Sequence, residues 1–338
     1  MTMNARRLLA IVACIGAPSR MLDAQPATAV SIAVAPPTCA MGAADSTWLI
    51  RALANWRVVE REILRLSPTA LPTIVTFDAR CAFVAKARAE GKLVWRGAIH
   101  GGRIILPDGK VIPPNVTSFA APADSGNGGF FVMSLPSVWR AQGVKSGLGV
   151  EGLMDVVLLH ELMHTRQFYY ANPKLAELTR RYNLSADMSD DDLQHAFEKN
   201  AAYVADYAKE RDLLFASAAA TDARESKRLA CEALSTLRAR RTRWFTGNSA
   251  QWAPLDEIFL TMEGLGQWTA YAWLVGDRGP HLKAAVAQRE IRRGGKHWTQ
   301  DEGLALFLVI DRHVKNWQTL AFAQEPLTAE ALLARACM

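Results

Sequence analysis

Between residues 70 and 135, hydrophobic positions alternate with polar ones or form short apolar runs. Gly, Pro and Asp bound these runs, and β-branched and aromatic residues fill them, which is typical of strands. Strands are predicted at residues 73–77, 93–95, 103–106, 110–112 and 130–135. Asp108-Gly109 predicts a hairpin, residues 126–129 a turn, and a short helix is expected after Cys81. This part should form a small, mostly antiparallel sheet.

After residue 150 the apolar positions recur every three or four residues, which indicates helices. Helices are predicted at residues 151–170, 193–220, 222–245, 255–275, 280–295, 301–315 and 327–336, with another at 45–66 before the sheet. Asn172-Pro173 should end the first of the later helices, because the position before proline disfavours helix. The pattern predicts a mostly helical α+β fold: one domain over residues 46–338, with an α/β part (46–140) followed by a helical part (150–338).

The N-terminal residues match a secretory signal peptide over residues 1–24. Arg6-Arg7 precede a short apolar run at residues 8–17, and Ala24 is a small residue at a cleavage point. A lipoprotein signal, with Ile11-Val12-Ala13 directly before Cys14, is the alternative. Residues 25–45 are rich in Ala, Pro and Thr, which predicts a flexible arm. No later segment has about 18 uninterrupted apolar residues, so the mature chain is expected to lack a transmembrane segment and to be secreted or periplasmic.

Four cysteines remain after such a cleavage: Cys39, Cys81, Cys231 and Cys337. An even number in an exported chain is typical of disulfides. Pairing within each half of the chain would join Cys39 to Cys81 and Cys231 to Cys337, and four buried free thiols are the alternative. The net charge of +6 is scattered, without a run of Lys and Arg interleaved with aromatics, so no nucleic-acid partner is expected.

The candidate chemistry lies in His160-Glu161-Leu162-Met163-His164, inside the helix predicted at 151–170. Positions i and i+4 are about 40° apart around a helix, so both imidazoles project from one face and can bind one Zn²⁺. Glu161 lies about 100° from His160 around the axis, within reach of a metal-bound water. The neighbouring residues are apolar, and burying two imidazoles and a carboxylate without partners would be costly. The pattern favours a metal site over a chance occurrence.

A catalytic zinc commonly has three protein ligands, and four glutamates compete for the third place. Glu263 is favoured because it is a lone acid among apolar and small residues, where neighbouring glycines would let another helix approach. Glu198 is the second candidate, because alanines suited to close packing follow it. Glu302 belongs to a Thr-x-x-Glu capping box, and Glu210 stands between two cations as a surface or ion-pair residue.

With the block Glu263-Gly264-Leu265-Gly266-Gln267-Trp268, the HExxH segment resembles the gluzincin branch of zinc metallopeptidases. The resemblance implies a zincin-like fold, with His160, His164 and Glu263 as zinc ligands and Glu161 as general base. Because 99 positions separate His164 from Glu263, it also implies an inserted helical hairpin at about residues 190–245.

The resemblance does not extend to every feature of that branch. Gln267 stands where thermolysin-like members place an Asp that orients a ligand imidazole, so the sequence does not identify that partner. Gly266 and Trp268 replace the Ala and Tyr that are commoner in aminopeptidase-like members. The Gly-x-Met-Glu-Asn exopeptidase motif is absent, so specificity for peptide N-termini is not implied.

The sequence therefore predicts a zinc-dependent hydrolase, a metallopeptidase cleaving a peptide or protein, in which Glu161 takes the proton of the attacking water. The strand at 130–135 precedes the motif helix, as the substrate-binding edge strand does in zincins, and would pair with an extended peptide. Tyr271, His281 and His297 are candidate oxyanion stabilisers. The alternatives are a non-catalytic zincin-like binding protein and a structural helical domain with an accidental motif.

Overall fold

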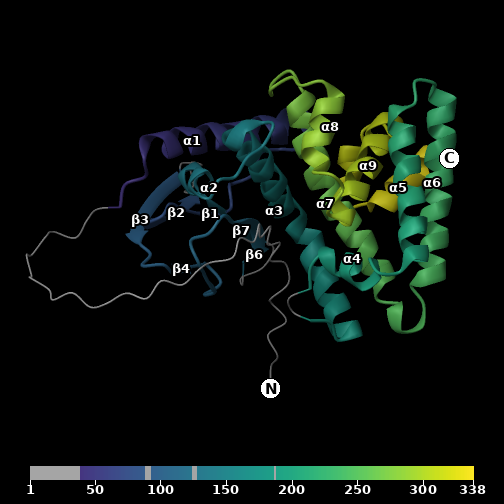
Figure 1. Ribbon diagram of the computed structural model, residues 1–338, viewed down its shortest axis with the longest axis horizontal. Coiled ribbons are helices and arrows are strands. Elements are labelled where there is room, and N and C mark those ends of the chain that lie inside the picture. The colour runs from purple at the N-terminus through teal and green to yellow at the C-terminus, as the bar shows by residue number, and fades with distance from the viewer. Residues whose placement is uncertain (1–38, 88–92, 124–127, 186–187) are drawn as a thin grey trace, which may run out of the picture.

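A five-stranded sheet lies at one end of the molecule and a group of helices at the other (Figure 1). The computed structural model describes residues 39–87, 93–123, 128–185 and 188–338. The predicted signal peptide, most of the predicted arm and part of the turn predicted at 126–129 lie outside these residues. Both ends of the molecule pack on α3 (Gly149–Tyr182), the helix that contains the HExxH segment. The fold is mixed α/β and mostly helical, as the sequence predicted.

The sheet has the strand order β3-β2-β1-β7-β6. Its strands are β1 (Thr73–Phe77), β2 (Cys81–Ala87), β3 (Leu93–Ile99), β6 (Ser118–Pro122) and β7 (Gly129–Ser134), and β4 (Ile104–Ile105) with β5 (Val111–Ile112) forms a separate hairpin. Neighbouring strands are antiparallel except β1 and β7, which are parallel. The prediction of a mostly antiparallel sheet is confirmed, and β6 is a strand that the sequence pattern did not reveal.

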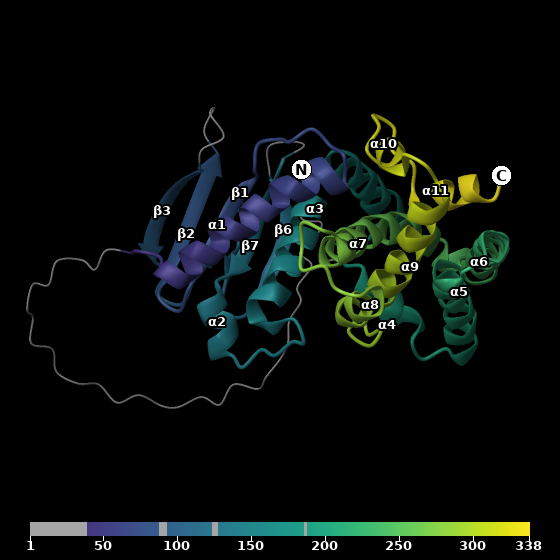
Figure 2. The same ribbon diagram turned by 90° about the horizontal axis from the view of Figure 1, so that it is seen from above.

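The two faces of the sheet pack against different layers, as a period of two requires. On one face, Ile74, Phe131 and Met133 join the main core, which α1 (Ala43–Val58), α3 and the later helices complete. On the other face, Val75 and Val132 belong to a smaller cluster covered by the β4–β5 hairpin. Figure 2 shows α1 lying across the strands with α3 beside it. The first face therefore fixes where α3 lies.

The helical part is organised around α7 (Trp252–Val275), which is buried along most of its length and packs between α3 and α9. The remaining α-helices of the described residues are α2 (Pro136–Ala141), α4 (Asp191–Phe197), α5 (Ala201–Ala219), α6 (Ala223–Trp244), α8 (Ala284–Arg292), α9 (Trp298–His313), α10 (Trp317–Ala321) and α11 (Ala329–Ala336). A π-helical turn (Val59–Ile63) continues α1, and a 3-10 turn (Gly247–Ser249) precedes α7. A helix that is apolar on every side is expected in a protein interior. Helices α5 and α6 form a hairpin on the far side of α9 (Figure 1).

Proline does not end the motif helix, so that prediction is wrong. Helix α3 continues through Pro173 to Tyr182, and Asn183 in a left-handed conformation follows it. Beyond the proline, Leu175 and Leu178 are buried in a cluster with Leu255, Phe259 and other residues of α7. Burial of one Leu side chain contributes about 1.5–3 kcal/mol to stability. The two leucines together therefore offset the loss of the hydrogen bond that proline cannot donate.

Two further predictions of local structure are wrong. The segment after Cys81 is a strand, β2, because Asp78 accepts hydrogen bonds from the N–H groups of Arg80 and Cys81 and turns the chain back along β1. The helix predicted at 193–220 is two helices, because the side chain of Asn200 accepts hydrogen bonds from the N–H groups of residues 202 and 203 and caps the start of α5.

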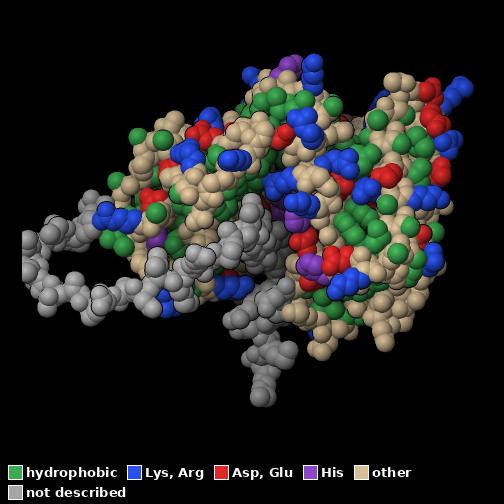
Figure 3. Space-filling model, in the orientation of Figure 1, with side chains coloured by type: hydrophobic (Ala, Val, Ile, Leu, Met, Phe, Trp, Pro, Cys, Tyr) green, Lys and Arg blue, Asp and Glu red, His purple; other side chains and the backbone are tan. Residues whose placement is uncertain are grey.

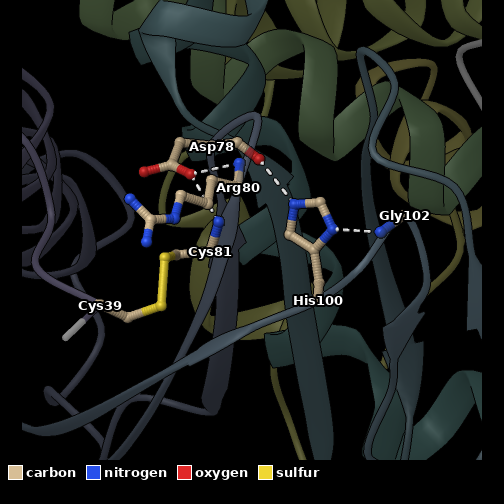
Figure 4. The surroundings of a disulfide bond; sticks show 6 residues. All are labelled: Cys39, Asp78, Arg80, Cys81, His100 and Gly102. Atoms are coloured by element: carbon tan, nitrogen blue, oxygen red, sulfur yellow. Dashed lines mark hydrogen bonds between the residues drawn. A yellow bond between two sulfur atoms is a disulfide. The ribbon is translucent and has the colours of Figure 1, made fainter. Parts of the chain in front are cut away.

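Each predicted disulfide pairing is present. Cys39 joins Cys81, which ties the segment before α1 to β2, and Cys231 on α6 joins Cys337 after α11. Figure 4 shows the first bridge beside the Asp78 turn, where His100 donates from Nε2 to the Asp78 carbonyl and accepts at Nδ1 from Gly102. Two disulfides are compatible with an oxidising compartment.

The surface carries mixed charge. On the face shown in Figure 3, Lys and Arg side chains are interspersed with Asp and Glu over the helical part. Among the helices formed by the described residues, none combines the length and the apolar character needed to span a bilayer.

Candidate metal centre

His160 and His164 lie one turn apart on α3 and are both buried. Their rings meet edge to face with centroids 4.7 Å apart, and the two Nε2 atoms are 3.0 Å apart. Two nitrogens bound tetrahedrally to one zinc at about 2.0–2.1 Å would be roughly 3.3 Å apart. The helix therefore presents both imidazoles with nearly the spacing that a shared ion requires.

Glu263 brings the third ligand from α7, where its side chain is fully buried. Its Oε2 lies 3.2 Å from Nε2 of His160 and its Oε1 lies 3.3 Å from Nε2 of His164. Within the described ranges, these three residues are the group of His, Cys, Asp and Glu whose ligand atoms come together, all within 4.8 Å of one another. The structure thus places together the three residues that the sequence favoured.

Small residues allow α7 to approach this closely. A Cβ atom at Gly266 would lie 2.6 Å from Nδ1 of His160, so only glycine leaves room for that ring. Two residues earlier, Gly264 packs against Gly303 of α9, and a Cβ there would lie 2.7 Å from the Gly303 carbonyl oxygen. The glycines beside Glu263 therefore set the spacing between three helices, as the sequence analysis expected.

A divalent ion fits this group because one buried oxygen has no other partner. Oε1 of Glu263 has no hydrogen-bond donor among the described residues, although it is shielded from solvent. Leaving a buried carboxylate oxygen without a donor lowers the stability of the fold by about 1–3 kcal/mol or more. Two neutral imidazoles and one carboxylate are also a donor set that zinc accepts in catalytic sites, with one position left for water.

Gln167 orients His164. Its Oε1 lies 2.8 Å from Nδ1 of His164, and its Nε2 donates to the Met262 carbonyl at 3.2 Å. Because the amide oxygen only accepts, His164 must carry its proton on Nδ1, which leaves the lone pair of Nε2 for a metal. This is the orienting partner that the sequence did not identify, and it lies three residues after His164 on the same helix face.

Glu263 is held by a chain of two amides. Gln300 donates from Nε2 to Oε2 of Glu263 at 3.2 Å, and Gln267 donates to Oε1 of Gln300 at 2.6 Å. Gln267 thus supports the carboxylate and not an imidazole. The remaining Oε1 of Glu263 is left for the metal.

Glu161 lies beside the histidines and points to β6. Its Oε2 accepts a hydrogen bond of 3.1 Å from the N–H of Ala120, on the side of β6 that faces away from the rest of the sheet. It is buried, yet it lines the same cavity as His160. Glu161 is therefore placed next to the candidate ligands without belonging to their group.

Burial and neighbouring charges together control the protonation of these residues. Burial lowers the pKa of His160, but the carboxylates of Glu263 and Glu161 outweigh it and raise that pKa above its usual value. Burial raises the pKa of the Glu161 carboxyl to about 7, although the charge of His160 opposes the rise. It lowers the pKa of His164 to about 4, so that this imidazole is neutral at pH 7. Burial alone would raise the pKa of Glu263, but the two histidines and Gln300 outweigh it and hold that pKa below its usual value. A neutral imidazole and an ionised carboxylate are the forms that bind metals.

A cavity of about 420 Å³ opens beside His160 and Glu161. Leu153, Val156 and Val157 continue the same face of α3 along the cavity, with Trp139 and Ile291 also in its wall. The opposite wall is polar and comes from α8, the loop after it and the start of α9. It includes Arg289, Glu290, Arg293, His297 and Gln300. The candidate ligands thus have an accessible side.

The rejected glutamates have other environments. Glu198 is exposed at the end of α4. Glu302 does not cap α9, so the capping-box prediction is wrong; instead Glu302 and Glu210 are buried and both pair with Arg240. The Arg240 cation is shared by these two glutamates and Asp256, and this pairing explains why the acids are buried. None of these glutamates belongs to the group around His160 and His164 in the described chain.

Of the three predicted oxyanion stabilisers, one lines the cavity and two do not. His297 lines the cavity and pairs with Asp191 at 3.2 Å. His281 is exposed and pairs with Asp277, and Tyr271 does not line the cavity. Arg293, which does line it, was not recognised in the sequence, although its place in Arg292-Arg293-Gly294-Gly295 at a helix end was a signal.

The edge-strand prediction is also wrong. β7 lies between β1 and β6, so neither of its sides is free to pair with a peptide. β6 is the edge strand, but residues 118–121 are buried and α3 covers them.

Comparison of the chain with protein-family models, with curated proteins and with solved structures found no match.

Proposed function

We propose that the protein is a secreted or periplasmic zinc-dependent hydrolase of the gluzincin type, a metallopeptidase. His160, His164 and Glu263 hold the metal, and Glu161 is the general base. The observation that carries the proposal is Glu263: an oxygen buried without a donor, 3.3 Å from an imidazole nitrogen that Gln167 keeps deprotonated. Zinc fits this set of ligands better than harder ions that prefer oxygen.

The chemistry divides between the metal and the chain. A bound zinc supplies Lewis acidity and lowers the pKa of water to about 7. Glu161 accepts a proton at the carboxylate oxygen that does not bond to Ala120, and returns it to the leaving amine. Its raised pKa, about 7, suits a group that must both take and give a proton near neutral pH.

The cavity supports a substrate with an apolar side chain. Its α3 wall is aliphatic and continues directly from His160, so a side chain next to the scissile bond would pack there. The two disulfides favour an oxidising compartment, in agreement with the signal peptide that the sequence predicts.

Substitution Glu161→Gln tests the role of the base. The amide keeps the shape and the hydrogen bond from Ala120 but cannot take a proton, so cleavage of casein or a peptide library should fall by about two to four orders of magnitude. Zinc content, measured by atomic emission, should stay at the wild-type value, because Glu161 is not a ligand.

The matched control is Glu177→Gln, an exposed glutamate on the same helix. It should leave both turnover and zinc content unchanged. Full activity of Glu161→Gln would remove Glu161 from the mechanism. Bound zinc without any peptide cleavage by the wild-type protein would favour the alternative, a non-catalytic binding protein.

A further inference from the structure

Arg293 stands out among the charged residues that line the cavity. Arg289 pairs with its neighbour Glu290, and His297 pairs with Asp191. Arg293 forms no ion pair or hydrogen bond with any residue of the described ranges, and neither does Lys145, which lines the cavity as well. Among the described residues, two cations that line the cavity beside the candidate metal centre are thus not engaged in ion pairs.

The backbone of Arg293 is in an unfavourable conformation. It follows the last turn of α8 with φ of 47°, in the left-handed region that glycine normally occupies at this position. Such a conformation is unfavourable for a non-glycine residue, and residues held in it cluster at active sites and ligand-binding positions. Gly294 and Gly295 follow immediately, so glycine is used for the next two left-handed positions but not for this one.

The surroundings of Arg293 strengthen its attraction for an anion. Although the residue is exposed overall, nearby protein atoms lower the pKa of its guanidinium, and the charge of Glu161 partly opposes this. A partly desolvated guanidinium binds a carboxylate more strongly than one in bulk water does. Figure 3 shows Lys and Arg side chains gathered below α8, with histidine and acidic side chains next to them.

We propose that Arg293, assisted by Lys145, binds a carboxylate of the substrate close to the bond that is cleaved. The inference rests on the proposed peptidase function and specifies its substrate class: peptides with an acidic group beside an apolar residue. A guanidinium binds a carboxylate through two parallel hydrogen bonds, which also fixes orientation. The carboxylate would come from the C-terminus of a peptide or from a Glu or Asp side chain.

Peptide binding tests this without requiring turnover. Three peptides are compared on the full-length, zinc-loaded Glu161→Gln protein by calorimetry: acetyl-Ala-Ala-Phe-Leu as free acid, the same peptide as C-terminal amide, and acetyl-Ala-Ala-Phe-Glu as C-terminal amide. At least one acidic peptide should bind about 10- to 100-fold more tightly than the neutral amide. Preference for the free acid would identify a C-terminal carboxylate, and preference for the Glu peptide an acidic side chain.

Adding Arg293→Gln should abolish that preference while the affinity for the neutral amide changes by less than about twofold. The matched control is Arg278→Gln, an exposed arginine paired with Glu62, which should preserve the preference. Equal affinities for all three peptides, or the same preference after Arg293→Gln, would overturn the proposal.

Kinetic measurements separate binding of a substrate carboxylate from stabilisation of the transition state. If Arg293→Gln in the otherwise unaltered enzyme lowered kcat equally for neutral and acidic peptides, Arg293 would stabilise the transition state and the substrate proposal would be wrong. If the unaltered protein bound no zinc and cleaved no peptide, the peptidase proposal would fail instead. The binding series can then be measured on the protein without zinc, so the two failures are distinguishable.

Discussion

At the scale of single residues, the protonation of His164 depends on its neighbours more than on its own chemistry. Burial lowers its pKa to about 4, and Gln167 fixes the proton of the neutral ring on Nδ1. The amide of Gln167 is in turn fixed by the Met262 carbonyl, next to Glu263 in the chain. One glutamine thus connects two of the candidate ligands across α3 and α7.

Replacing this glutamine should weaken metal binding without removing a ligand. Gln167→Leu leaves His164 free to take the other tautomer or to rotate, and loss of such an orienting partner costs about 10- to 100-fold in metal affinity. Competition with a fluorescent zinc chelator would measure the change. Gln142→Leu, at an exposed position after α2, should have no effect, and an equal loss in both variants would count against the role of Gln167.

Glu161 should make the metal-free protein less stable as pH rises. Its folded-state pKa, about 7, is above the value of 4.5 in an unfolded chain, so its contribution to stability is present below pH 4.5 and is lost as pH rises through 7. Glu161→Gln, which stays neutral, should therefore gain stability relative to the unaltered protein over that range, on the order of 2–3 kcal/mol.

Urea unfolding of chelator-treated protein at pH 4.5, 6 and 8 measures this difference. Glu198→Gln, at an exposed position, should show little dependence on pH. A Glu161→Gln protein that lost stability relative to the unaltered protein between pH 4.5 and 8 would contradict the burial of an acid that resists ionisation.

At the scale of elements, the site depends on how closely α7 approaches α3. Glu263 and Gly266 lie on one side of α7, three positions apart, so the carboxylate and the space for the His160 ring come from the same helix face. The sequence pattern revealed the glycines but not their partners, because contacts between helices distant in the chain leave no periodicity.

Gly266→Ala should separate these two helices. The new Cβ would lie 2.6 Å from Nδ1 of His160, so the ring must rotate away from Glu263 and the affinity for zinc should fall by at least tenfold. Thermal unfolding should also occur at a lower temperature. Gly42→Ala, where nothing lies within 4 Å of the new Cβ, is the control. Unchanged zinc affinity in Gly266→Ala would show that His160 is not a ligand in this orientation.

Hydrophobic periodicity and apolar runs predicted the elements well where neighbouring residues determine the local structure. Predictions from proline and capping patterns failed where contacts with distant parts of the chain outweigh local preferences. The period of β1 and the apolar run of β7 led to strands within one residue of those observed. Pro173 predicted a helix end, but contacts of Leu175 and Leu178 with α7 continue the helix. Arg240 could not be anticipated as the common partner of three acids, so the role of Glu302 was misjudged.

At the scale of the whole molecule, residues far apart in the chain form one site. Glu161 touches β6, His164 is oriented next to α7, and Gln300 reaches Glu263 from α9. The sequence predicted the three candidate ligands because two share a helical turn and the third is an isolated acid. It did not predict the cavity, since Arg293 enters it only through the packing of α8 against α7.

Metal content with the coordinating atoms identified tests the central claim most directly. Anomalous diffraction at the zinc edge from crystals of the full-length protein should show one ion per chain. Nε2 of His160, Nε2 of His164 and a carboxylate oxygen of Glu263 should bind it at about 2.0–2.2 Å. Glu263→Ala should lose the ion. Stoichiometric zinc in Glu263→Ala, or an ion bound away from the two histidines, would contradict the account.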